Sequence, residues 1–209
     1  MTLRRTIALG VDIALAISML WMMSYPVTRG LLRHGICGII LLLLVALHNV
    51  INLRWYLALP RGTWSARRML TAAAALLLIL AFLALSASAL VMAGDVFPCA
   101  PFAMPWWGRG LHSASAAWLF ALASFHLGLH GNHFWKALQH ALGKAYPFAA
   151  AMAAGACALA FWKSGLWMDM LLMERAGGHP AQLLFWAQLA GSGAFFCIAA
   201  RICRSAAGR

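Results

Sequence analysis

The stretch that decides the fold is RHGICGIILLLLVALHNVINLRWY, residues 33–56, in which two histidines flank a long apolar segment. His34 and His48 lie fourteen residues apart in this segment. On an α-helix, fourteen steps of about 100° return to within about 40° of the starting direction and rise about 21 Å. Both imidazoles would therefore share one helix face and lie near opposite surfaces of a membrane.

The same spacing recurs in LHSASAAWLFALASFHLGLHGNHFW, residues 111–135, where His112 and His126 again lie fourteen residues apart. Ionisable side chains inside membrane helices are rare and usually mark a functional site. Histidine nitrogens are also common axial ligands of haem iron. We therefore predict that His34, His48, His112 and His126 are iron ligands that hold two stacked haems.

The composition places the whole chain in a membrane. Of its 209 residues 64% are hydrophobic and 10% are charged, and the mean hydropathy is +0.82. This balance is typical of integral membrane proteins. Six apolar runs are long enough to cross a hydrocarbon layer of about 30 Å, namely residues 7–25, 35–55, 70–92, 111–129, 147–167 and 181–202. We predict an all-α, polytopic membrane protein in which one domain, residues 1–209, forms a bundle of six transmembrane helices.

The net charge of +12 predicts orientation and not nucleic-acid binding, because the basic residues follow the loops and form no patch with interleaved aromatics. With a cytoplasmic N-terminus, most lysines and arginines fall on the cytoplasmic side, namely Arg4, Arg5, Arg54, Arg61, Arg67, Arg68, Lys136, Lys144, Arg201, Arg204 and Arg209. Arg29, Arg33, Arg109, Lys163 and Arg175 fall on the other side. We expect both termini in the cytoplasm and a multi-pass protein of the bacterial inner membrane.

This topology pairs the histidines. The second and fourth predicted spans cross in the same direction, so His34 would face His112 near the outer surface and His48 would face His126 near the inner surface. No C-x-x-C-H sequence is present, and the haems would therefore be b-type. His130 follows His126 by one helical turn and is an alternative inner ligand, although it gives a spacing of eighteen residues. His130 and His133 could instead lie near haem propionates or a quinone headgroup.

Two polar residues accompany the histidines. Asn52 follows His48 by four residues, where it could donate a hydrogen bond to haem or quinone or simply cap the helix. Asp12 lies about two turns into the first span. We expect its carboxylate to reach the inner membrane surface, with proton movement as the alternative role.

Residues 33–56 resemble the H-x-x-x-G and H-x-x-x-N-W-R-W stretch of the flavinylation-associated cytochromes, a family of small bacterial membrane cytochromes b, with Leu53 at the first tryptophan position. Residues 111–135 resemble the other histidine helix of that family, and MAGDVF, residues 92–97, is similar to the end of its intervening helix. The resemblance implies electron transfer from a quinol or another inner-side donor to an extracytoplasmic redox protein, for example a flavin-bearing one. Quinone is then a further candidate cofactor, and lipid and the quinone pool are expected partners.

Other functions remain open at this point. The connecting segments are too short to fold alone, so we expect an electron-transfer subunit of an oxidoreductase system. The spacing of the histidines is shared with ferric-reductase-like proteins and with cytochrome b of quinol-oxidising complexes. The main alternative is a haem b anchor subunit of a molybdenum enzyme or a hydrogenase. An anchor without haem and a small-solute transporter are alternatives of other classes.

Overall fold

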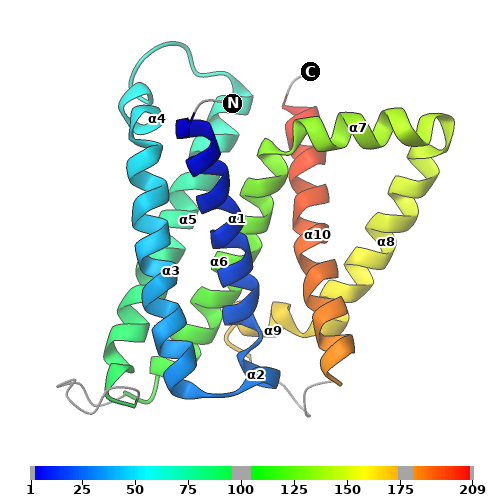
Figure 1. Ribbon diagram of the computed structural model, residues 1–209. Coiled ribbons are helices and arrows are strands. Elements are labelled where there is room, and N and C mark those ends of the chain that lie inside the picture. Colours follow the sequence, from blue (N-terminus) through cyan, green and yellow to red (C-terminus); the bar gives the residue numbers. More distant parts are fainter. Residues whose placement is uncertain (1–2, 96–104, 174–180, 208–209) are drawn as a thin grey trace. The chain divides into compact units, whose positions relative to one another are not determined.

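The computed structural model describes residues 3–95, 105–173 and 181–207, which form helices and contain no strand (Figure 1). Six helices have 19 to 26 residues: α1 (Leu3–Met23), α3 (Leu31–Ile51), α5 (Ala66–Val91), α6 (Gly108–His130), α8 (Tyr146–Ser164) and α10 (Gln182–Ala206). Shorter segments connect them: α2 (Tyr25–Thr28), α4 (Leu53–Ala58), η1 (Ala93–Asp95), α7 (Asn132–Leu142), η2 (Gly143–Ala145) and α9 (Leu166–Met170). The all-α prediction is confirmed for this part of the chain. Arg175, Arg209 and the last two residues of MAGDVF lie outside the described residues.

Five helical segments of the described chain are long and apolar enough to cross a membrane. They are α1, α3, α5, α10 and the stretch Asn132–Ser164, whose apolar part is α8. Several spans of this kind in one chain are typical of a multi-pass membrane protein. The remaining predicted span, the fourth in the chain (residues 111–129), coincides with α6, which is long enough but does not reach the same hydropathy. The histidines, serines and glycines of α6 lower its hydropathy.

The chain forms two compact units. The first unit comprises Met1–Thr63 and Ser86–Gly108. Within it, α1 and α3 pack side by side and run in opposite directions (Figure 1). The polypeptide reverses between them at Arg29 and Gly30, which both have positive φ angles, of 53° and 99°. A single domain over residues 1–209 stays a prediction.

The second unit comprises Trp64–Leu85 and Arg109–Arg209. Helix α10 packs along α8, and it also contacts α6, where the Cys197 thiol donates to the carbonyl of Ser124 at 3.0 Å. A small hydrophobic core joins α5, α6 and α10 through Ala74, Leu129 and Ala200. The long helix α6 thus lies at the centre of the packing of this unit.

The six apolar runs of the sequence leave residues 130–146 as a connection between two predicted spans, but this connection contains the helix α7. The structure forms eleven helical residues there, and α7 runs crosswise to α8 and α10 (Figure 1). Its polar residues, Asn132, His133, Lys136, Gln139 and His140, occur at helical spacing and gather on one side. Its opposite side is apolar. A short helix of this pattern is typical of the boundary between membrane and water.

Candidate functional site

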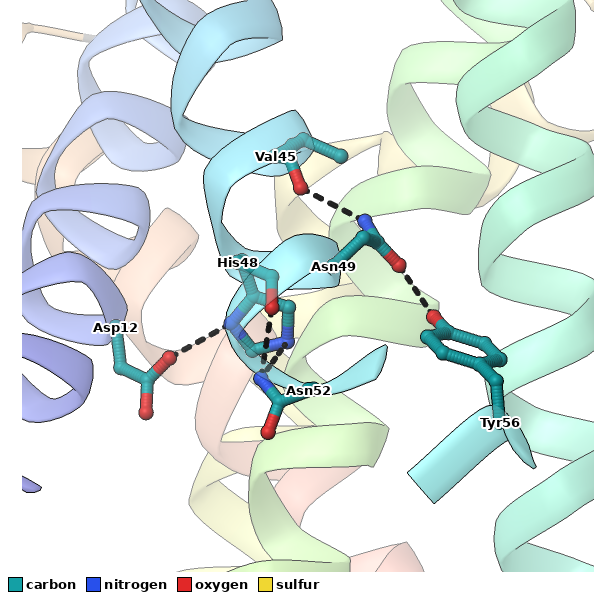
Figure 2. A network of polar contacts seen from close by, with 6 residues as sticks. All are labelled: Asp12, Val45, His48, Asn49, Asn52 and Tyr56. Carbon is teal, nitrogen blue, oxygen red and sulfur yellow. Dashed lines mark hydrogen bonds and ion pairs between the residues drawn. The ribbon is translucent and has the colours of Figure 1, made fainter. Parts of the chain in front are cut away.

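The best defined polar site of the first unit surrounds His48, three residues before the end of α3 (Figure 2). Its Nδ1 lies 2.8 Å from Oδ1 of Asp12, which projects from α1. The antiparallel packing of α1 and α3 explains the contact, because the Met22–Gly38 contact fits the same register. The structure thus gives Asp12 a specific contact with a predicted iron ligand. That its carboxylate lies at the inner membrane surface stays a prediction.

Asn52 ends α3 and lies on the other side of the His48 ring. Its backbone N–H and its side-chain amide both donate to the carbonyl of His48, at 3.1 and 2.8 Å. The same amide nitrogen lies 3.5 Å from Nε2 of His48, at the outer limit of a hydrogen bond. Asn52 thus caps the C-terminal end of α3, which is one of the two roles that the sequence suggested for it. Of the two ring nitrogens of His48, Nδ1 therefore has the short hydrogen bond and Nε2 has only the long contact.

A second set of hydrogen bonds fixes the chain just after His48. Asn49 donates to the carbonyl of Val45 at 2.7 Å and accepts a hydrogen bond from the hydroxyl of Tyr56 in α4 (Figure 2). Burial raises the pKa of the Tyr56 phenol, so that the hydroxyl stays protonated and can donate. Arg4 of α1 donates to the carbonyl of Ile51 at 2.9 Å. These contacts hold the end of α3 against both α1 and α4.

His34 lies in the first turn of α3, where its backbone N–H bonds to the carbonyl of Gly30 at 3.0 Å. The ring of Tyr25 contacts the imidazole edge-on, with the ring centroids 4.8 Å apart. No break separates His34 from His48 within α3. Both side chains therefore lie on one continuous helix, and the fourteen-residue spacing retains its predicted geometry.

His112 and His126 likewise share one continuous helix, α6, in the second unit. Both imidazoles are half-buried, whereas His130 is exposed. The rings of His126 and His130 lie 4.7 Å apart between centroids and are tilted by 51°. The two candidates for one iron ligand are therefore immediate neighbours.

The face of α6 that carries the histidines is not the face that packs on α10. Gly128 meets α10 so closely that an added Cβ would lie 2.5 Å from the carbonyl oxygen of Cys197. At 100° per residue, Gly128 points about 160° away from both His126 and His130. Gly128 therefore serves the packing of α6 against α10.

The four histidines are divided equally between the two compact units. His34 and His48 belong to one compact unit, and His112 and His126 belong to the other. Pairing across the two helices therefore stays a prediction. Among the described residues no three or more His, Cys, Asp or Glu side chains form a metal-binding group. Bis-histidine ligation of haem needs only two side chains for each iron.

Sequence reasoning singled out Asp12 but missed its partner, and it missed Tyr56. The available signal for Asp12 was an acidic residue inside an apolar helix, which usually has a polar partner. The partner follows only from the register of α1 against α3, which the spacing of residues within either helix does not determine.

These observations define the class: a helical, multi-pass membrane protein whose α3 and α6 each carry two histidines fourteen residues apart. Comparison with protein-family models, with curated proteins and with solved structures gives no match.

Proposed function

We propose that this protein is a di-haem membrane cytochrome b that carries electrons across the membrane. Its iron ligands are His34 with His112 and His48 with His126. Haem iron held by two histidines changes between its ferric and ferrous states, which is the chemistry of electron transfer. The chain supplies the ligands, the apolar surroundings and the hydrogen bonds that orient the ligands.

The observation that carries the proposal is the hydrogen-bond arrangement of His48. Histidines that bind a metal commonly donate their second ring N–H to a carboxylate, which fixes the tautomer and the ring orientation. The contact of 2.8 Å between Nδ1 of His48 and Asp12 has this form. Nε2, which has only a long hydrogen-bond contact of 3.5 Å with the Asn52 amide, is then the nitrogen that binds iron. This donor set fits a haem ligand better than a buried structural histidine.

The proposal requires α6 to be a sixth transmembrane span. Its 23 residues exceed the length needed to cross the hydrocarbon layer. Haem bound at His112 and His126 would offset the cost of placing their polar rings in lipid. Six spans put both termini on one side, and the distribution of basic residues favours the cytoplasm.

The resemblance of residues 33–56 and 111–135 to flavinylation-associated cytochromes supplies the proposed context. Electrons would enter from the quinone pool or an inner-side donor and leave to an extracytoplasmic redox protein, with a flavin-bearing protein as the first candidate. The membrane is then a bacterial cytoplasmic membrane. Asn52 is a candidate hydrogen-bond donor to quinone, because its amide lies beside the His48 ring.

Haem content of the purified protein tests the proposal. After expression with an adequate haem supply, we expect a reduced-minus-oxidised spectrum with a b-type α band and two haems per chain. His140→Ala is the matched control, because His140 lies in α7, outside the two histidine helices, and its loss should leave both haems. A folded protein without haem would refute the proposal and favour an anchor without electron traffic.

Identification of a co-purifying redox protein tests the partner separately. A flavin-bearing extracytoplasmic protein would support the electron conduit that the resemblance implies. A molybdenum enzyme or a hydrogenase would identify the chain as the haem b anchor subunit of that complex, with the same haem ligands.

A further inference from the structure

We propose that Asp12 is a positioning residue for His48 that lowers the reduction potential of one haem. This inference rests on the proposed function, because it assigns a role to Asp12 only if His48 binds haem iron. The observation behind it is the contact of 2.8 Å between Oδ1 of Asp12 and Nδ1 of His48. The two residues come from different helices of the same compact unit.

The contact decides which nitrogen of His48 can bind a metal. A carboxylate accepts a hydrogen bond, so Nδ1 of His48 carries the proton and Nε2 keeps its lone pair. Asn52 does not compete strongly for that lone pair, because its amide is 3.5 Å away and donates at 2.8 Å to the carbonyl of His48 instead. Asp12 therefore presets the tautomer that a haem ligand requires.

The charge of Asp12 has a second consequence. A carboxylate that accepts the Nδ1 proton increases the electron density of the imidazole and makes it a stronger ligand. A stronger, more negative ligand stabilises ferric iron relative to ferrous iron. Hydrogen bonding around an axial ligand is one of the means by which a protein adjusts haem potential. The predicted direction is a lower potential for the haem that His48 binds.

The local structure shows that this contact is held in place. Arg4 bonds to the carbonyl of Ile51 at 2.9 Å, which fixes α1 against the end of α3. On the opposite side, Tyr56 and Asn49 tie α4 to α3. The Asp12 carboxylate and the His48 imidazole thus come from two packed helices that are fixed by further contacts nearby. Fixed surroundings of this kind allow Asp12 to hold the His48 ring in one orientation.

Asp12→Asn is the decisive variant. Asparagine has nearly the same shape and keeps an oxygen that can accept from Nδ1, but it removes the charge. We expect two haems per chain and a higher midpoint potential for one of them in a potentiometric titration followed by the visible spectrum. The shifted haem must be the one that His48→Ala removes. Asp12→Glu keeps the charge and should return the potential toward that of the unmodified protein.

Asp169→Asn is the matched control for the loss of an acidic charge, because Asp169 lies in α9, outside the helices α1 and α3 that form the contact, and should leave the potential of the His48 haem unchanged. If Asp12→Asn loses the His48 haem while Asp12→Glu keeps it, the orienting role is supported directly. Two bound haems with unchanged potentials in Asp12→Asn would overturn the inference and leave the proposed function standing. Absence of haem from the unmodified protein would instead refute the proposed function, and the role of Asp12 with it.

Discussion

Gly128 of α6 lies so close to Cys197 of α10 that a Cβ at position 128 would be 2.5 Å from the carbonyl oxygen and 2.6 Å from Cα of Cys197. Both contacted atoms belong to the backbone, which cannot rotate away as a flexible side chain could. The Cys197 thiol bonds to the carbonyl of Ser124, one turn earlier on α6. The two helices are therefore in direct backbone contact here, and only glycine fits.

The first prediction is that Gly128→Ala destabilises the protein by roughly 1–3 kcal/mol, the usual cost of overpacking. The measurement is unfolding in detergent, followed by circular dichroism. Gly155→Ala is the control, because Gly155 lies in α8 and a Cβ there meets no described atom within 4 Å. The control should be neutral or slightly stabilising, since alanine favours helix more than glycine does. Equal effects of the two variants would contradict the close contact.

The second prediction concerns the contact between α8 and α10 at Gly191. A Cβ on Gly191 would lie 2.5 Å from the Cβ of Ala160. We expect Gly191→Ala to destabilise the protein and the added change Ala160→Gly to restore most of the loss, because it removes the colliding methyl group. A double-mutant cycle should give a coupling within the range of about 0.5–3 kcal/mol found for residues in contact. Additive effects of the two changes would show that the methyl groups do not meet.

Much of the fold follows from the sequence, because long apolar runs at helical length have few other structures in a membrane. The boundaries are less predictable, and α3 shows why. The apolar run predicts a span over residues 35–55, whereas the helix comprises Leu31–Ile51 and includes His34. Gly30, with its positive φ, starts the helix earlier, and Asn52 ends it sooner by bonding to the carbonyl of His48.

The helix α7 shows a different limit. A search for apolar runs passes over residues 132–142, because their polar and apolar residues alternate with the period of a helix and no run is long enough to span a membrane. The periodicity itself was present in the sequence and would have predicted an amphipathic helix. The Asp12–His48 contact had no such signal, since it depends on the relative register of two helices and joins residues 36 positions apart along the chain.

The third prediction tests the pairing of the histidines. His34→Ala and His112→Ala should each remove the same haem, and His48→Ala and His126→Ala should each remove the other. The reason is that a bis-histidine iron loses its site when either ligand is lost. Visible spectra and midpoint potentials of the four variants identify the haem that remains. Four different spectra, or loss of the same haem in His34→Ala and His48→Ala, would contradict parallel pairing of α3 with α6.

The last prediction decides between His126 and His130, whose rings lie 4.7 Å apart on α6. We expect His126→Ala to remove the haem that His48 binds and His130→Ala to leave both haems. The spacing of fourteen residues on α3 and α6 favours His126, and the half-buried position of His126 is better suited to a ligand within the membrane than the exposed position of His130. His133→Ala, three residues further along the chain in α7, is the control that should spare both haems. Loss of a haem in His130→Ala but not in His126→Ala would move the ligand one helical turn toward α7 and would break the equality of the two spacings on which the pairing depends.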